Sequence, residues 1–138
     1  MEKQLPRGIR NNNPLNIRVG NKWLGEVENP TDKDFEQFKT MLYGLRAGFY
    51  LLKRYIKRYK LCTIKEIISR WAPESENNTK RYVESVSRMA GIGILDEISF
   101  EDVEGMCAIV SAMCYIENGQ YVDADLINEA YWLVRYNH

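Results

Sequence analysis

Histidine is nearly missing from this sequence. The 138 residues contain one histidine, His138, and it is the last residue. A Ser-His-Asp or Cys-His site needs an imidazole held in place by packing, and most zinc peptidases and amidases use histidine ligands. A chain end that frays is a poor place for either role. The sequence therefore argues against histidine-dependent chemistry and leaves carboxylate chemistry, with no metal and no cofactor.

Cysteine, long apolar runs and net charge are also scarce. There are three cysteines, Cys62, Cys107 and Cys114, and an odd count argues against a closed disulfide framework. No stretch is long enough to span a membrane, and the first ten residues do not resemble a signal peptide, so we expect synthesis in the cytoplasm without one. The formal net charge is zero, which argues against a nucleic-acid-binding protein.

The length suits one compact domain, 1–138, with two differently built parts. Residues 1–40 contain three of the four prolines and most of the asparagines. Short extended pieces at 16–19, 22–27 and 35–38 predict a small β-hairpin or three-stranded sheet among loops. Residues 41–138 show helical spacing of apolar residues. The fold class is therefore mainly α with a small N-terminal β-region, that is, α+β.

Helix-capping residues mark the expected helices of the second part. The spacing predicts a first helix near 43–59. Thr63 can cap a short helix that Pro73 ends, and Thr79 can cap another that Gly91 ends. Two more helices follow, one near 100–117 with a capping-box-like start and one that begins at Asp123.

The helix near 100–117 places a carboxylate at the end of an apolar stripe. Val103, Met106, Val110 and Met113 follow each other on one face, and Glu117 is the next position on that face. Burial and the negative end of the helix dipole both disfavour the ionised carboxylate, and a raised pKa is what a general acid needs near neutral pH. Glu117 is therefore the candidate catalytic acid. The alternative is an outward-turned, solvated Glu117.

Several segments in chain order resemble a family of phage virion proteins related to lysozyme-like wall-degrading enzymes. They are RGIRNNNPLNIR at 7–18, WLG at 23–25, FEQF at 35–38 with YGLRA at 43–47, RWAP at 70–73 with ENNT at 76–79 and Tyr82, and ENG at 117–119. The resemblance implies a lysozyme-like helical domain. It also implies cleavage of peptidoglycan glycan strands, of the lysozyme or lytic transglycosylase type.

The order of the parts suggests a circular permutation. Glucosaminidases and lytic transglycosylases have a catalytic glutamate at a helix end, followed by an asparagine-rich turn and a short β-region. In this chain the turn and the β-region come first and Glu117 comes late. We treat permutation as a hypothesis, which requires residues 11–14 to lie near Glu117.

Polar and aromatic residues near the N-terminus are candidates for substrate binding. Amides suit sugar hydroxyl and N-acetyl groups, an arginine suits a carboxylate, and an indole face suits a sugar ring. The candidates are Asn11, Asn12, Asn13, Asn16, Arg18 and Trp23, together with Asn118 beside the acid. Turn formation, structural ion pairing and core packing are the respective alternatives.

Other charged residues leave alternatives open. Glu26 is the candidate second carboxylate, which could stabilise an oxocarbenium ion or activate water; Asp34 and Glu76 are further acids. A basic cluster lies on the outer face of one helix: Lys53, Arg54, Lys57, Arg58 and Lys60. It could attract an anionic polymer, or it could be an ordinary solvated face.

The resemblance sets the expected partners and place of action. We expect the protein to act on peptidoglycan strands at the cell wall or within a phage virion, where other virion proteins are further candidate partners. The main rival is a non-catalytic virion structural or glycan-binding module on the same fold. A nucleic-acid-associated protein that uses the basic cluster and a wall endopeptidase are weaker rivals.

Overall fold

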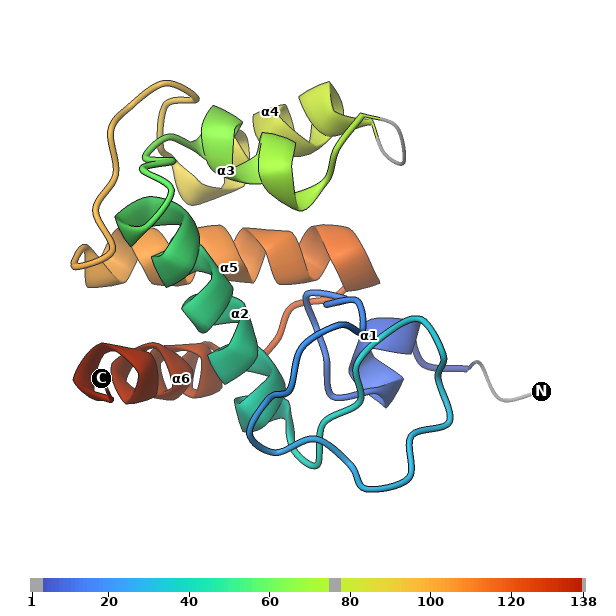
Figure 1. Ribbon diagram of the computed structural model, residues 1–138. Helices are drawn as coiled ribbons and strands as arrows, with labels where there is room; N and C mark the ends of the chain where they lie inside the picture. Colours follow the sequence, from blue (N-terminus) through green and yellow to red (C-terminus); the bar gives the residue numbers. More distant parts are fainter. Residues whose placement is uncertain (1–3, 75–77, 138) are drawn as a thin grey trace.

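A computed structural model describes residues 4–74 and 78–137, and this part of the chain is mainly helical (Figure 1). Glu76 and His138 lie outside the described residues. Within these ranges the helices are α1 (Arg7–Arg10), α2 (Met41–Lys57), α3 (Ile64–Trp71), α4 (Thr79–Ala90), α5 (Val103–Asn118) and α6 (Ala124–Tyr136). The mainly helical class expected from the sequence is confirmed.

Side-chain caps set most of the helix starts. Thr63 accepts a hydrogen bond from the backbone N–H of Glu66, and Asp123 caps α6, as the sequence predicts. The cap of α4 is Asn78 and not Thr79. The Thr79 hydroxyl instead donates to the carbonyl oxygen of Ala72, and thereby ties the start of α4 to the end of α3.

Helix α2 lies two residues earlier than the spacing predicts. Thr40 accepts a hydrogen bond from the backbone N–H of Tyr43 and so starts the helix at Met41. The helix ends at Lys57, and Lys60 has a φ of 59°. The chain thus leaves the helical conformation before Tyr59, although apolar spacing continues that far.

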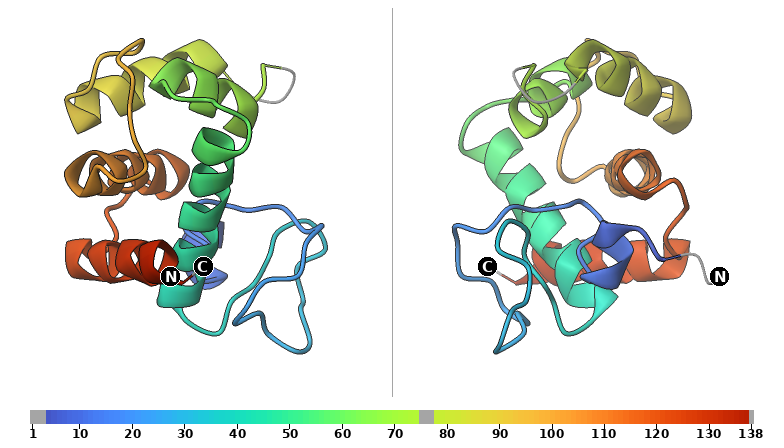
Figure 2. Two further views of the ribbon diagram at one scale, coloured as in Figure 1. Left: turned by 60° about the vertical axis from the view of Figure 1, so that its left-hand side comes forward. Right: turned by 90° about the vertical axis from the view of Figure 1, so that its right-hand side faces the viewer.

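Helix α5 runs through the middle of the helical part, between α4 and α6 (Figures 1 and 2). The sequence predicts one apolar stripe, but Gly105, Ile109 and Ala112 are buried as well. A helix that is apolar nearly all round is one that neighbours cover on several sides. Glu117 lies near the C-terminal end of α5, where the Asn16 side chain of the N-terminal region contacts it.

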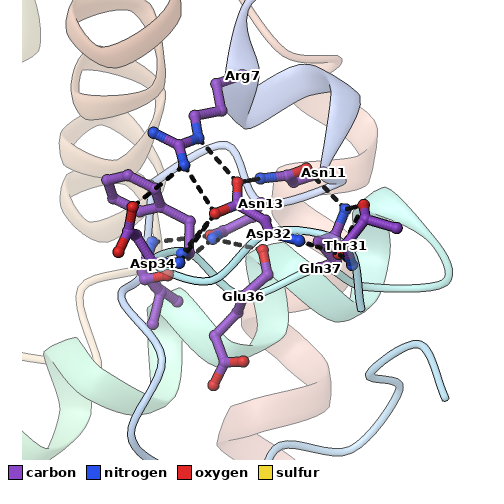
Figure 3. Close-up of polar contacts among 10 residues, drawn as sticks. Arg7, Asn11, Asn13, Thr31, Asp32, Asp34, Glu36 and Gln37 are labelled. Atoms are coloured by element: carbon purple, nitrogen blue, oxygen red, sulfur yellow. Dashed lines mark hydrogen bonds and ion pairs between the residues drawn. The ribbon is translucent and has the colours of Figure 1, made fainter. Parts of the chain in front are cut away.

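The predicted N-terminal sheet is wrong. Among residues 4–74 and 78–137, extended pairing is limited to two isolated antiparallel bridges, Arg18 with Phe35 and Glu26 with Phe38. Side-chain amides add to the few backbone hydrogen bonds between these segments, such as that from the Glu36 N–H to the Ile17 carbonyl oxygen at 2.9 Å. The buried Asn13 amide donates to the carbonyl oxygens of Ile17 and Glu36 at 2.9 and 3.0 Å (Figure 3).

Asp32 is the centre of a second set of side-chain contacts in this region (Figure 3). Arg7 donates two hydrogen bonds to its carboxylate at 2.7 and 2.8 Å, and the Asn11 amide donates a third at 2.9 Å. The Arg7 contact is the main reason that the pKa of Asp32 lies well below its usual range. The aspartate is therefore ionised at any pH of interest and braces α1 against the loop.

The N-terminal region docks on the helices at two places. The Asn118 amide donates to the carbonyl oxygens of Pro14 and Cys114 at 2.7 and 2.9 Å, which joins the loop to the end of α5. At the start of α2 the backbone of Gly44 lies directly against the carbonyl oxygen of Asn12. A side chain at position 44 has no room there.

Other expectations about the whole chain can be compared with the described residues. All three cysteines are free, and Cys114 is buried. None of the helices formed by residues 4–74 and 78–137 combines the length and apolar character needed to cross a bilayer.

Gly44→Ala tests the docking of the loop on α2. Alanine usually stabilises a helix by about 1 kcal/mol relative to glycine. Here the added Cβ meets the Asn12 backbone, so we expect the free energy of unfolding in urea to fall by about 1–3 kcal/mol. Ser69→Ala, at an exposed position of α3, is the control and should change it by less than about 0.5 kcal/mol. A Gly44→Ala protein as stable as the wild type would contradict the contact.

Candidate functional site

A cleft of about 310 Å³ lies where the N-terminal loop meets α2, α3 and the end of α5. The loop supplies one wall, and α2 and the end of α3 supply the other. The lining residues are Leu15, Asn16, Ile17, Arg18, Asn21, Phe35, Leu51, Tyr55, Trp71, Ala72 and Glu117. Glu117 is the one carboxylate among them, so it is the acid that a molecule in this cleft would meet.

Two neutral side chains hold the Glu117 carboxylate. The Asn16 amide donates to Oε1 at 2.8 Å, and the Tyr82 hydroxyl donates to Oε2 at 2.9 Å. Asn16 comes from the N-terminal loop and Tyr82 from α4, so elements distant in sequence orient this one carboxyl group. The solvated, outward-turned alternative for Glu117 is not what the structure shows.

Burial raises the pKa of Glu117 above its ordinary value. The hydrogen bonds from Asn16 and Tyr82 favour the ionised form and oppose this shift, but burial is the larger effect. The carboxyl group also lies at the C-terminal end of α5, where the negative end of the helix dipole further disfavours the ionised carboxylate. The arrangement favours an acid that keeps its proton to higher pH than a solvated glutamate.

Tyr82 stays protonated beside this acid. The residue is buried, and burial together with the Glu117 charge raises the pKa of its hydroxyl well above the ordinary value. A tyrosine that does not ionise acts as a hydrogen-bond donor over the whole pH range of interest. Tyr82 is therefore suited to hold the carboxylate in one orientation.

The backbone at Gly8 makes room for two amide groups next to the acid. A Cβ on Gly8 would collide with the Asn118 amide oxygen and approach the Asn16 amide oxygen within 2.9 Å. Because both oxygens face Gly8, the amide N–H groups point the other way. The Asn16 N–H group then reaches Glu117, and that of Asn118 reaches Pro14.

The structure brings only some of the predicted binding residues to the cleft. Asn16 and Arg18 line it. The amides of the other asparagines are taken up inside the protein: Asn11 binds Asp32, Asn12 binds the Phe38 carbonyl oxygen, Asn13 binds Ile17 and Glu36, and Asn118 binds Pro14 and Cys114. Asn12 and Asn16 have the positive φ, 53° and 51°, that the turn-forming alternative expects.

The other candidate acids lie elsewhere. Glu26 is not among the cleft residues and lies instead beside Glu36, which is 8% exposed. Burial, followed by the hydrogen bond and charge of Glu26, raises the pKa of Glu36 to about 7. Asp34 is 3.6 Å from Arg7 in an ion pair. Glu26 and Glu36 thus form an acid pair in the N-terminal loop, separate from Glu117.

The aromatic residues of the cleft differ from the one that the sequence singles out. Trp23 is partly buried against the core and is not a lining residue. Tyr55, Trp71 and Phe35 line the cleft instead. Helical spacing identifies Trp71 and Tyr82 only as core positions, and the missed signal is the tyrosine hydroxyl, which needs a polar partner when buried.

No metal centre accompanies the acid within residues 4–74 and 78–137. This part of the chain contains no group of three or more histidine, cysteine, aspartate or glutamate side chains that could hold an ion.

Comparison with known proteins identifies a phage relative. The chain is 44% identical to Protein P5 of Pseudoalteromonas phage PM2 over 117 residues, which are 82% of this chain and 71% of that protein. The chain belongs to the family of phage Protein P5. No family model matches the sequence. This membership confirms that the chain belongs to a phage protein family, and the relative's name states no function.

The acid pair in this Protein P5 relative predicts a pH-dependent stability. The folded protein holds a proton on Glu36 up to a pKa of about 7, whereas the ordinary value is 4.5. Because the folded state binds more protons than the unfolded state in this window, the free energy of unfolding falls as pH rises from about 4.5 to 7. Above that window both states are ionised and the loss is complete.

Glu36→Gln should remove this part of the pH dependence. We expect the fall in Tm between pH 5 and pH 8 to be smaller in the variant than in the wild type, by about 3 °C or more. Glu104→Gln, at an exposed position of α5, is the matched control and should keep the wild-type fall. Equal falls in Glu36→Gln and wild type would contradict a shared proton at the acid pair.

Proposed function

We propose that this protein cleaves the β-1,4 bonds between the amino sugars of peptidoglycan, with Glu117 as the general acid. The observation that carries the proposal is the placement of one partly buried, doubly hydrogen-bonded carboxyl group in a cleft with aromatic walls. The raised pKa of Glu117 suits an acid that must be protonated before the reaction.

The proposed step is the protonation of a glycosidic oxygen. Glu117 donates its proton to the oxygen while the bond between that oxygen and the anomeric carbon breaks, and the released sugar leaves with a new hydroxyl group. Positive charge develops at the anomeric carbon. A water molecule or the substrate's own 6-hydroxyl group then attacks this carbon, and the Glu117 carboxylate takes up the proton that the attacking group loses.

The two possible attacking groups give different products. Attack by water gives a reducing end and makes the protein a hydrolase. Attack by the 6-hydroxyl group gives an anhydro-muramyl end and makes it a lytic transglycosylase. Among the described residues, Glu117 is the one carboxylate that lines the cleft, which favours a scheme in which the substrate or water completes the reaction. Glu26 does not line the cleft, so it does not lie where it could take the assisting role predicted for it.

The walls of the cleft suit a sugar chain. Tyr55 and Trp71 lie edge to face at 6.1 Å on one side, and Phe35 lies on the other with the Arg18 guanidinium 4.9 Å from its ring. Aromatic faces pack well against the apolar faces of pyranose rings. Arginine beside them suits a carboxylate such as the lactyl group of a muramic acid residue.

We also propose that the fold is a circularly permuted, lysozyme-like domain. The permutation hypothesis requires the asparagine-rich turn to lie next to the helix-terminal glutamate. The hydrogen bonds from Asn16 to Glu117 and from Asn118 to Pro14 support that requirement. The rival is a non-catalytic glycan-binding or structural module of a phage virion.

Glu117→Gln tests the proposed chemistry. We expect the wild type to release glycan fragments from purified peptidoglycan, detected by mass spectrometry, and the variant to release them at least about 100-fold more slowly. The variant should still bind the wall, because the amide keeps the shape of the side chain. Glu104→Gln is the control and should keep wild-type activity. A folded wild-type protein that binds the wall without releasing fragments would identify the non-catalytic module instead.

Tyr82→Phe tests the positioning of the acid. The hydroxyl of Tyr82 stabilises the ionised carboxylate, so its removal should raise the pKa of Glu117 further. Activity needs the protonated acid, and the alkaline limb of kcat/KM against pH should therefore move to higher pH. Tyr121→Phe, at an exposed tyrosine, should leave the limb in place. A limb that stays put in Tyr82→Phe would mean that this hydrogen bond does not act on the titrating group.

A further inference from the structure

Charge is strongly segregated along a chain whose net charge is zero. Residues 41–62 contain six arginines and lysines and no acidic residue, whereas residues 89–134 contain nine acidic residues and no arginine or lysine. The basic stretch covers α2 and the turn that follows it. The chain therefore presents one positive region although its total charge suggests none.

Arginines near the end of α2 and in α3 lie close to aromatic rings. The guanidinium of Arg70 lies 4.3 Å from the centroid of the Tyr59 ring and 5.3 Å from that of Tyr55. Arg58 approaches the Tyr59 ring at 6.0 Å. We call the set Arg54, Tyr55, Arg58, Tyr59 and Arg70 the arginine strip.

The arginine strip is continuous with the cleft. Tyr55 belongs to both, since it lines the cleft and contacts the ring of Trp71, another lining residue. Tyr59 is 40% exposed, and Arg54, Arg58 and Arg70 are exposed. A polymer that fills the cleft can therefore continue across the strip to the outside of the protein.

The arginines of the strip have no acidic partner within the described ranges. The ion pairs there join Arg7 to Asp32 and Asp34, and Lys57 to Glu101. Lys57 is thus neutralised on the same helix, while Arg54, Arg58 and Arg70 are not. Stacked guanidinium groups keep their hydrogen-bond donors at the plane's edge, where carboxylates bind.

We propose that the arginine strip binds the carboxylates of the acidic stem peptide carried by the glycan strand. This inference rests on the proposed function, because it assumes that a wall glycan occupies the cleft. The glycan would run through the cleft past Tyr55, and the stem peptide of a neighbouring sugar would extend onto the strip. The protein would then distinguish peptide-bearing strands from bare ones by charge.

Duplex nucleic acid fits the same surface less well. Binding to a polyphosphate backbone gains from a broad positive field. In this chain all the charged residues of 89–134 are acidic, and the net charge is zero. The strip is short and leads into a cleft that holds an acid, Glu117. A short run of carboxylates next to a glycan is the closer match in size and charge.

The test measures binding with the Glu117→Gln protein, so that the strands stay intact. The ligands are glycan strands with their stem peptides and strands of the same length from which an amidase has removed them. We expect the additional changes Arg54→Gln and Arg58→Gln together to weaken binding of peptide-bearing strands roughly tenfold at low salt. Binding of bare strands should not change, and added salt should reduce the difference.

Two further variants separate charge, stacking and folding. Arg70→Lys keeps the charge but removes the guanidinium group that lies near the Tyr55 and Tyr59 rings. It should weaken the binding of peptide-bearing strands less than the double change does. Lys39→Gln with Arg88→Gln removes the same charge from exposed positions elsewhere and should have no effect. Circular dichroism of each variant shows whether it is folded.

The outcomes distinguish this inference from the proposed function. If the wild type releases no glycan fragments but binding still depends on the stem peptide and on the strip, the inference holds and the proposed cleavage fails. If peptide-bearing and bare strands bind equally, or the double change has no effect, the inference is overturned. Tighter binding of duplex DNA than of peptide-bearing strands at the same salt would also overturn it.

Discussion

The structure depends on the contact between the N-terminal loop and the end of α5. Asn118 holds the Pro14 carbonyl oxygen, and Asn16 holds the carboxyl group of Glu117. Without this contact the loop wall of the cleft would be missing, and Glu117 would be an ordinary solvated glutamate at a helix end. The loop thus creates both the cleft and the burial that raises the pKa of the acid.

Helices were predictable from the sequence because their signals are local. Apolar spacing, the caps at Thr63 and Asp123 and the glycine at 91 act within one or two turns, and such signals predicted the helices α2 to α6 to within a few residues. The N-terminal region was not predictable in this way. Its alternating residues resemble strands, but among the described residues the pairing stops at two isolated bridges, and the Asn13 amide contacts carbonyl oxygens of two segments, at Ile17 and Glu36.

The candidate site was predictable in its central residue only. Glu117 follows from the position of a charge on an apolar stripe, which is a property of one helix. Tyr82, Tyr55 and Phe35 reach the site from three other segments, and nothing local in their sequence marks them. The asparagines stand out in the sequence, but most of their side-chain hydrogen bonds are made within the protein, as in the contact from Asn11 to Asp32.

The bond between Asn16 and Glu117 joins residues 101 positions apart, and that between Asn118 and Pro14 joins residues 104 apart. Closing a loop of this length costs conformational entropy, and contacts of such long range slow folding. During synthesis the loop leaves the ribosome long before α5 exists, so the amides wait for a carboxylate that has yet to be made. Glu117 can therefore be enclosed only after α5 has been made, and a chain that stops before α5 lacks one wall of the cleft.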